Sequence, residues 1–394
     1  MEVFLPYFLD WGNFLLRWTH LIVGIAWIGA SFYFVYLDNH LVPPKEVDLK
    51  DKGVGGELWA VHGGGIYNSQ KYLNAPKVMP PHMHWFYWES YATWLTGFSL
   101  FVLAYLLHPS VMLIDKNVFD MTPQVAVFAA LAYLATGWVV YNSICKVLGV
   151  GEAADKKVAV VVLIYVFFAA LVACHLFSGR AAFLLTGAML ATIMSANVFF
   201  WIIPGQKIVI NDLENGRTPD PIYGLRAKQR SVHNTYFTLP VLFAMISNHY
   251  SMLYGAGNNW LVLVGIMASG ALIRHFFVSR HKNHPSYLSL SVGVGILLGI
   301  IFMLLPSPRV VAVDAAPPSF AQVKSIIEQR CVLCHNEQVA SKNIRLDKPN
   351  FIESQASLIY QQAVVSKSMP LNNATNITDE ERYSLGGWYK SLNK

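Results

Sequence analysis

The chain has 394 residues, of which 54% are hydrophobic and only 13% are charged, and its formal net charge is +6. Soluble globular domains carry roughly 25% charged residues, so this composition excludes a wholly soluble protein and indicates lipid as the surroundings of much of the chain. The positive charge alone would fit a nucleic-acid partner, but it forms no basic run or stacking platform, and we predict no such partner.

Eight apolar segments, each long enough to cross a bilayer as a helix, follow one another along most of the chain. They are expected at residues 13–36, 86–107, 122–144, 158–178, 181–203, 232–250, 259–279 and 286–305. The first is expected to remain in the membrane rather than be cleaved as a signal, because Glu2 and Asp10 precede it instead of lysines. The predicted fold class is all-α, with an integral membrane bundle of about eight transmembrane helices over residues 1–306.

Basic residues are distributed unevenly over the two sides of this predicted bundle. The loops after the first, third, fifth and seventh segments carry fifteen of them: Lys45, Lys50, Lys52, Lys71, Lys77, Lys146, Lys156, Lys157, Lys207, Arg217, Arg226, Lys228, Arg230, Arg280 and Lys282. The opposite side carries three, Lys116, Arg180 and Arg309. The positive-inside rule makes the first side cytoplasmic. We therefore expect a multi-pass protein of the bacterial inner membrane, with its N-terminus and C-terminal region in the periplasm.

The first cytoplasmic loop, residues 37–85, is too long for a mere connector. It contains the run His62-Gly63-Gly64-Gly65, which is similar to an esterase oxyanion loop, and the stretch Met79-Pro80-Pro81-His82-Met83-His84. No G-x-S-x-G elbow accompanies the glycine run, so we discard the esterase interpretation. We expect the loop to cover a pocket instead.

Polar residues inside membrane segments are costly and are functional candidates by default. His20, His175 and His249 all fall near the periplasmic ends of their segments. A pair of them could ligate a non-covalent b-type haem, and hydrogen-bonded histidines at the membrane interface are the alternative. Small residues on the same segments are expected to serve close helix packing, namely Gly24 and Ser31 in the first segment and the Gly295/Gly299 pair in the last.

The cytoplasmic ends of the segments carry a second polar group. Glu89 and His84, with His233 from a later segment, are the candidate catalytic residues, because general acid–base chemistry needs carboxylates and imidazoles. Other side chains nearby could recognise a planar polar heterocycle: Trp85, Trp88, Gln206, Asn234, Thr235, Arg274 and His275. The alternative is that these residues anchor the helices at the interface.

A Pro-rich linker, residues 307–318, separates the bundle from a C-terminal region of ordinary soluble composition, residues 319–394. Cys331-Val332-Leu333-Cys334-His335 is the attachment motif of c-type haem. Its two cysteines bind the porphyrin covalently, and His335 ligates the iron. Met369 is the only methionine after residue 318 and is therefore the candidate sixth ligand. The alternatives are that the two cysteines form a zinc-binding or redox-active C-x-x-C motif, and that Met369 only packs in the hydrophobic core.

Around this motif the sequence predicts a small helical domain similar to class I cytochromes c. Thr378 and Glu381 form a capping box that opens the last helix. The glycines of Gly386-Gly387-Trp388 are expected to let two helices cross closely. One covalent haem c would replace much of the core that so short a domain cannot build by itself.

The segments Arg17-Trp18-Thr19-His20, Pro81–Tyr91 and His233–Tyr250, with the C-terminal haem motif, identify a resemblance. The chain resembles the PuuD family of membrane-bound urate oxidases with a fused cytochrome c. The resemblance implies oxidation of urate to 5-hydroxyisourate in purine breakdown, without release of hydrogen peroxide. It also implies that electrons pass to the c-type haem and on to a soluble cytochrome c or a terminal oxidase. The alternatives are a non-catalytic subunit carrying electrons from quinol or a partner dehydrogenase, and a haem-bearing transporter or sensor.

Overall fold

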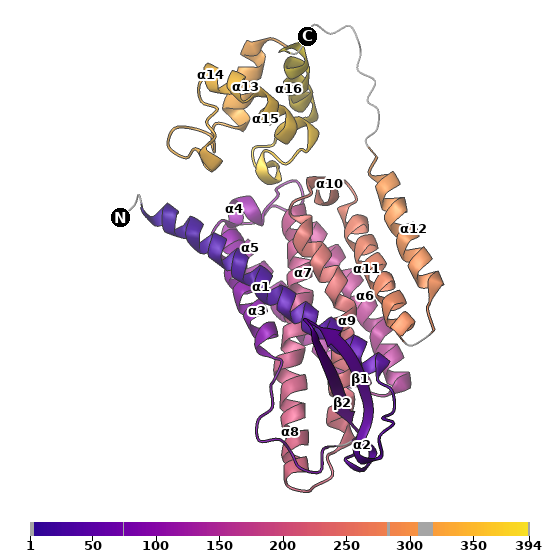
Figure 1. Ribbon diagram of the computed structural model, residues 1–394. Coiled ribbons are helices and arrows are strands. Elements are labelled where there is room, and N and C mark those ends of the chain that lie inside the picture. Colours follow the sequence, from indigo (N-terminus) through magenta and orange to yellow (C-terminus); the bar gives the residue numbers. More distant parts are fainter. Residues whose placement is uncertain (1–3, 74, 282–283, 306–317, 393–394) are drawn as a thin grey trace.

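The computed structural model describes residues 4–73, 75–281, 284–305 and 318–392. Long helices make up most of the N-terminal part of the chain (Figure 1). Each predicted apolar segment coincides with one helical stretch. In chain order these are α1 (Phe4–His40), α3 (Trp88–Phe101) continued by the π-helical η1 (Val102–Leu106), α5 (Pro123–Leu148), α6 (Glu152–Leu176), α7 (Gly179–Asn197) continued by η2 (Val198–Ile202) and α8 (Ile203–Glu214), α9 (Pro221–Ser247), α11 (Asn259–His281) and α12 (Tyr287–Met303).

Local sequence explains where several of these helices begin. The side chains of Thr122, Ser178 and Asp220 accept hydrogen bonds from backbone N–H groups in the first turns of α5, α7 and α9. In α5 and α9 a proline follows the capping residue directly, where its missing N–H costs nothing. These helix starts are therefore encoded locally.

Five helices of the described part are long and apolar enough to cross a membrane. They are Tyr7–His40, Pro123–Leu148, Glu152–Leu176, Gly179–Glu214 and Asn259–His281. The other three do not meet that length and hydropathy: α3 with η1 begins with polar and aromatic residues, α9 carries many buried polar residues, and α12 is apolar but has only 17 residues. Long apolar helices are compatible with a membrane protein.

A β-hairpin corrects the prediction of an all-helical chain. Strands β1 (Val54–His62) and β2 (Gly65–Tyr72) pair antiparallel within the first loop, which also holds the short α2 (Val47–Asp51). Gly63 and Gly64 connect them with φ of +57° and +81°, as a two-residue type I′ turn requires. The glycine run is therefore a hairpin turn, and its conformational freedom explains the glycines without any catalytic role.

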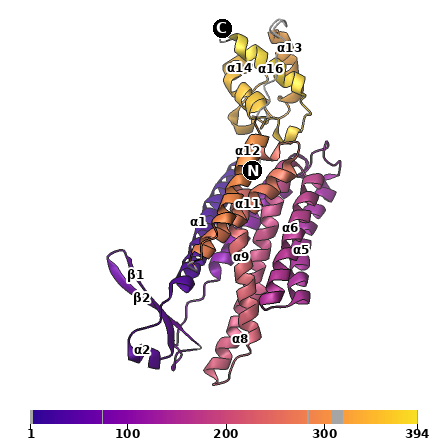
Figure 2. The ribbon, with the colours of Figure 1, turned by 90° about the vertical axis from the view of Figure 1, so that its right-hand side faces the viewer.

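The hairpin and α8 lie at one end of the helical bundle, and the C-terminal unit (residues 318–392) lies at the other (Figures 1 and 2). We call these the hairpin end and the docked end. The amide of Asn372 donates to the backbone carbonyl of Val111, within the short α4 (Pro109–Met112), at 2.5 Å. The Ser251 hydroxyl, in α10 (Ser251–Tyr254), donates to the carbonyl of Ser366. The loops after the second and sixth segments thus meet the C-terminal unit, as an alternating bundle requires.

The bundle core lies between α5, α6, α7, α9 and α11. Close packing depends on small residues at some crossings: a Cβ added to Gly187 would lie 2.5 Å from the Cβ of Ala244. The glycines expected to serve packing behave differently, because a Cβ added to Gly24, Gly295 or Gly299 would meet nothing within 4 Å in the described residues. The packing role predicted for these glycines is therefore wrong within this chain. On α12 it is Gly293 that packs, against α11.

The C-terminal unit has a separate small hydrophobic core. Its elements are α13 (Phe320–Arg330), η3 (Ser341–Asn343), α14 (Pro349–Ser354), α15 (Ala356–Ile359), η4 (Tyr360–Val365), η5 (Leu371–Asn373) and α16 (Asp379–Leu392). The first and last helices pack together, with the rings of Phe320 and Trp388 6.0 Å apart. Gly386 instead faces η4, where an added Cβ would lie 3.2 Å from Val364. The predicted linker lies almost wholly outside the described residues.

The predicted capping box of the last helix is confirmed. The Thr378 N–H donates to the Glu381 carboxylate at 2.8 Å, and the Glu381 N–H donates to the Thr378 hydroxyl at 3.2 Å. The same carboxylate accepts three hydrogen bonds from the Arg330 guanidinium: Nε donates to both oxygens at 3.1 Å, and Nη2 donates to one of them at 2.9 Å. Glu381 therefore joins the start of α16 to the end of α13, directly before Cys331.

Candidate functional site

The C-x-x-C-H motif begins where α13 ends. Cys331 is the C-cap of that helix and packs against the core of the C-terminal unit, whereas Cys334 is exposed. The backbone N–H groups of Cys334 and His335 both donate to the carbonyl of Cys331 at 3.1 Å. The motif is thus a tight turn that presents both thiols and the imidazole within one short segment.

The His335 ring is oriented by a backbone group, which is what a metal-ligating histidine needs. Its Nδ1 lies 3.2 Å from the carbonyl oxygen of Ile344, and donation from Nδ1 leaves Nε2 available to a metal. Met369 is half-buried, and its backbone is held by Gln362 and by Arg382, whose guanidinium donates to the Met369 carbonyl at 2.7 Å. This set of two thiols, one oriented imidazole and one thioether fits a c-type haem.

The alternatives for this motif gain no support. Burial raises the pKa of the Cys331 thiol to about 11, whereas C-x-x-C redox motifs need a lowered thiol pKa. No group of three or more His, Cys, Asp or Glu side chains that could hold a metal occurs in the part of the chain that the structure describes. The motif therefore lacks the ligands of a zinc site.

The loop that carries Met369 is also the part of the C-terminal unit that meets the bundle. Ser366 and Asn372, three residues to either side of Met369, make the contacts with α10 and with the end of α4. Asn117 adds a third contact, donating to the side chain of Asn376 at 3.4 Å. These contacts therefore hold the loop of Met369, the candidate iron ligand, against the docked end of the bundle.

The three histidines predicted to hold a b haem lie on or directly after different helices and in different surroundings. His20 faces α3, where its Nδ1 lies 3.0 Å from the Thr96 hydroxyl and its Cε1 would lie 2.8 Å from a Cβ on Gly97. His175 is exposed, with its Nδ1 on the carbonyl of its own helix at Leu171, and His249 is exposed after α9. No contact among the described residues joins any two of these histidines, and the b-haem site stays a prediction.

A buried polar network occupies the half of the bundle nearer the hairpin end. The Tyr141 hydroxyl lies 2.8 Å from Nδ1 of His233. Asn197 donates both to that hydroxyl at 3.0 Å and to Asn234 at 2.9 Å. Arg230, only 2% exposed, donates to Asn197 at 3.2 Å. Nδ1 of His233 is therefore paired inside the bundle.

Arg230 corrects the count of basic loop residues. The structure buries it inside α9, which begins eleven residues before the predicted segment, whereas the other basic residues of this set are exposed where the structure describes them. Its second donor reaches Asn142 at 3.1 Å, and its guanidinium lies 4.9 Å from the centre of the Trp201 ring. Amide oxygens and aromatic faces thus stabilise this cation.

The candidate catalytic residues lie at the hairpin end but in different surroundings. Glu89 is in the first turn of α3, and its Oε2 is buried without a hydrogen-bond partner in the described residues. His84 is exposed before α3, with its ring 4.5 Å from that of Phe86. No contact among the described residues joins Glu89 to His84 or His233. Of the three, Glu89 alone has unused bonding capacity in a buried place.

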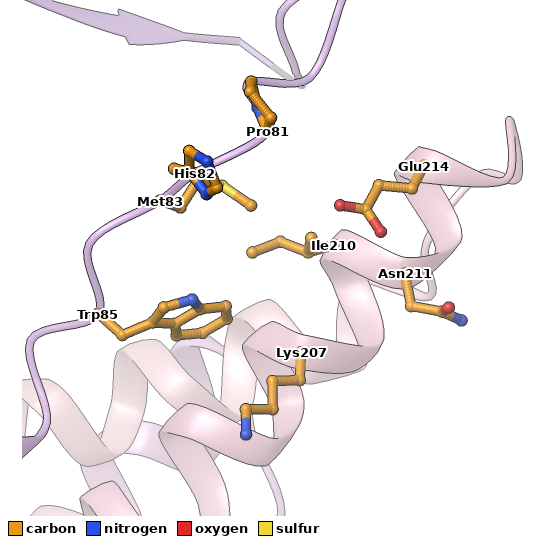
Figure 3. A pocket seen from close by; sticks show the side chains of 8 residues that line it. All are labelled: Pro81, His82, Met83, Trp85, Lys207, Ile210, Asn211 and Glu214. Carbon is orange, nitrogen blue, oxygen red and sulfur yellow. The ribbon is translucent and has the colours of Figure 1, made fainter.

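The first loop does border a pocket, as predicted for it. A cavity of about 400 Å³ lies between this segment and α8, open to the outside. Figure 3 shows its lining: Pro81, His82, Met83, Trp85, Lys207, Ile210, Asn211 and Glu214. Trp85 reaches the cavity from the loop, and Lys207 reaches it from α8. This cavity is peripheral to the buried polar network.

Four residues of this network were not among the functional residues predicted from the sequence: Tyr141, Asn142, Asn197 and Arg230. Asn197 could have been found, since it is a lone amide within an otherwise apolar segment. Phe32 was also missed: its ring lies 3.9 Å from the guanidinium carbon of Arg274. Nothing in the local sequence marks this phenylalanine, because the pairing depends on how α1 crosses α11.

Comparison with known proteins supplies the identity of the bundle. No curated protein and no solved structure gives a significant match to the chain. The model of one protein family, described as urate oxidase N-terminal, matches residues 6–305 and so covers every helix of the bundle. The chain therefore belongs to the urate oxidase N-terminal family, which points to oxidoreductase chemistry on urate.

Proposed function

We propose that this protein oxidises urate to 5-hydroxyisourate inside an eight-span membrane bundle and delivers the electrons to a c-type haem on its C-terminal unit. One observation carries the proposal: a bundle of the urate oxidase family and an oriented C-x-x-C-H site occur on one chain and contact each other. The domain boundaries at 1–306, 307–318 and 319–394 belong to this proposal.

The reaction balances without oxygen as a reactant. Urate and one water give 5-hydroxyisourate, two protons and two electrons, with a new C–O bond at C5. Because the acceptor of the electrons is not oxygen, no hydrogen peroxide forms. A chain that carries its own electron acceptor suits this chemistry.

Glu89 is the base of the proposed reaction. Its buried Oε2 lacks a hydrogen-bond donor in the described residues, so it is free to accept a proton from urate or from the attacking water. His233 supports the pocket through Tyr141 rather than exchanging protons, because its Nδ1 is already paired with that hydroxyl. His84 is a proposed proton relay between Glu89 and the exterior, since it is exposed just before α3.

The residues of the C-terminal unit would hold the electron acceptor. Cys331 and Cys334 would attach the porphyrin, and His335 and Met369 would ligate the iron. A haem held in this way accepts electrons one at a time at a raised potential. Glu89 lies at the hairpin end and the C-terminal unit at the docked end, so the electrons would have to cross the bundle, and an intermediate b haem would be the relay that this path needs. A soluble cytochrome c or a terminal oxidase would take the electrons onward.

The excess of basic loop residues at the hairpin end supports a cytoplasmic position for that end. The C-terminal unit then lies in the periplasm of a bacterial inner membrane, where covalent haem attachment takes place. Correcting Arg230 leaves fourteen of the fifteen residues on the cytoplasmic side, so the asymmetry persists.

Anaerobic reduction of the purified full-length protein tests the proposal. A pyridine haemochrome spectrum should show c-type haem, and urate should reduce that haem. Cys331→Ala should abolish covalent attachment, whereas Cys174→Ala, which removes a thiol inside the bundle, should not. If quinol reduces the haem and urate does not, the chain is an electron-transfer subunit and the oxidase proposal fails.

A further inference from the structure

Two arginines are enclosed in the bundle nearer its hairpin end, and they differ in how their charge is met. Arg230 on α9 is 2% exposed and Arg274 on α11 is 6% exposed. Neither forms an ion pair with a carboxylate among the described residues. A buried cation without a counter-ion is strongly unfavourable unless other groups stabilise it.

Arg230 has such groups and Arg274 does not. The guanidinium of Arg230 donates to the side-chain oxygens of Asn142 and Asn197. In Arg274, Nε and Nη2 are both buried and have no hydrogen-bond partner in the described residues. Of these two buried arginines, only Arg274 therefore has two N–H donor groups without an acceptor in the described residues.

The geometry of the unused donors restricts what could pair with them. Nε and Nη2 lie on one edge of the guanidinium, so their N–H bonds are parallel and match two adjacent acceptor atoms. The Phe32 ring covers one face of the group, with its centre 3.9 Å from Cζ. A planar anion that meets this edge would continue the plane of the guanidinium.

We propose that Arg274 is the residue that recognises the substrate anion, binding urate in a bidentate manner through Nε and Nη2 while Phe32 fixes the guanidinium plane. This inference rests on the proposed function. Urate is a planar monoanion at neutral pH, with carbonyl oxygens next to ring nitrogens that offer paired acceptors. The substrate then supplies the missing counter-ion, and a neutral purine of the same shape does not.

If an unpaired buried charge recognises urate, replacing Arg274 should have opposite effects on the stability of the free protein and on urate binding. Arg274→Met removes a buried cation that the ligand-free protein does not pair, so thermal stability without urate should be unchanged or higher. Urate binding should weaken by about 30-fold or more, since truncating one side of a buried charged pair is costly. A purely structural arginine would show the reverse pattern, with lost stability and retained affinity.

The experiment measures equilibrium binding of radiolabelled urate, and its thermal stabilisation, with the full-length protein in detergent. Arg280→Met is the matched control, because Arg280 is exposed on the same helix, six residues after Arg274. Hypoxanthine, which is neutral at pH 7, is the second probe. Arg274→Met should lose the preference for urate over hypoxanthine, and Arg280→Met should keep it.

A second variant covers the case in which Arg274→Met does not fold. Arg274→Lys keeps the charge but lacks the planar fork, and it should bind urate about tenfold more weakly at unchanged stability. Wild-type affinity and selectivity in either variant would overturn the assignment of Arg274. That result would leave the proposed function intact as long as urate still reduces the haem, whereas failure of the wild-type protein to respond to urate would refute the proposed function itself.

Discussion

Removing the carboxylate of Glu381 should loosen the part of the C-terminal unit that carries the haem motif. Glu381 caps α16 through the Thr378 N–H and pairs with Arg330, which precedes Cys331. The side chains of this pair are only 25% and 20% exposed, so solvent screens them weakly. Glu381→Gln keeps a cap, because glutamine also serves in a capping box, but it loses the ion pair. Glu381→Ala loses both.

The expected magnitudes follow from these contacts. Loss of the bidentate pair should cost about 1–2 kcal/mol, and loss of the cap about 1 kcal/mol more. Hydrogen exchange of the α13 and α16 amides in the full-length protein, followed by mass spectrometry, measures the opening free energy directly. Protection should fall by about 5- to 30-fold in Glu381→Gln and by about 30- to 150-fold in Glu381→Ala.

The effect should also depend on pH. Burial alone would raise the pKa of Glu381, but the Arg330 guanidinium and the Thr378 N–H together hold it below its usual 4.5. A lowered pKa in the folded state stabilises above the unfolded-state value, and this stabilisation disappears as the pH falls through the lowered value. The difference in amide protection between wild type and Glu381→Gln should therefore be largest at pH 7 and should disappear in acid.

Glu380→Gln, which removes an exposed charge in the same turn, is the control. Equal protection in Glu380→Gln and Glu381→Ala would refute the reasoning.

Three further substitutions test other parts of the account. Met369→Ala should abolish the spectrum of a methionine-ligated c haem, and an unchanged spectrum would remove Met369 from the iron. Gly97→Ala should lower the unfolding temperature because its Cβ would lie 2.8 Å from Cε1 of His20, whereas Gly295→Ala, which meets nothing within 4 Å, should leave that temperature unchanged. Glu89→Gln should slow haem reduction by urate about 10²- to 10⁴-fold, as expected for loss of a general base, and a wild-type rate would exclude that role.

Much of the helical architecture could be predicted because its signals are local. Hydropathy located all eight helical stretches, and the spacing of Thr378 and Glu381 gave the capping box. The hairpin was missed because Gly63 and Gly64 were considered as a loop motif rather than as a turn between strands. The helix ends were also underestimated, since α8 and the start of α9 continue the helices beyond their apolar segments.

The candidate site was predicted less completely, because it depends on contacts between helices. Nothing in the sequence shows that His20 packs on Gly97 of α3. The same holds for Arg274, whose unpaired edge and contact with Phe32 become visible only once α1 and α11 are packed. A residue type can be recognised from one sequence, but its partner on a distant helix cannot.

Anaerobic titration of the oxidised protein with urate tests the central claim most directly. Because urate gives up two electrons and a single haem takes one, about half an equivalent of urate per chain should reduce the c-type haem fully. The product should be 5-hydroxyisourate, and the same protein in air should release no hydrogen peroxide. A haem that stays oxidised while urate is consumed in air, with one peroxide formed per urate, would contradict the account.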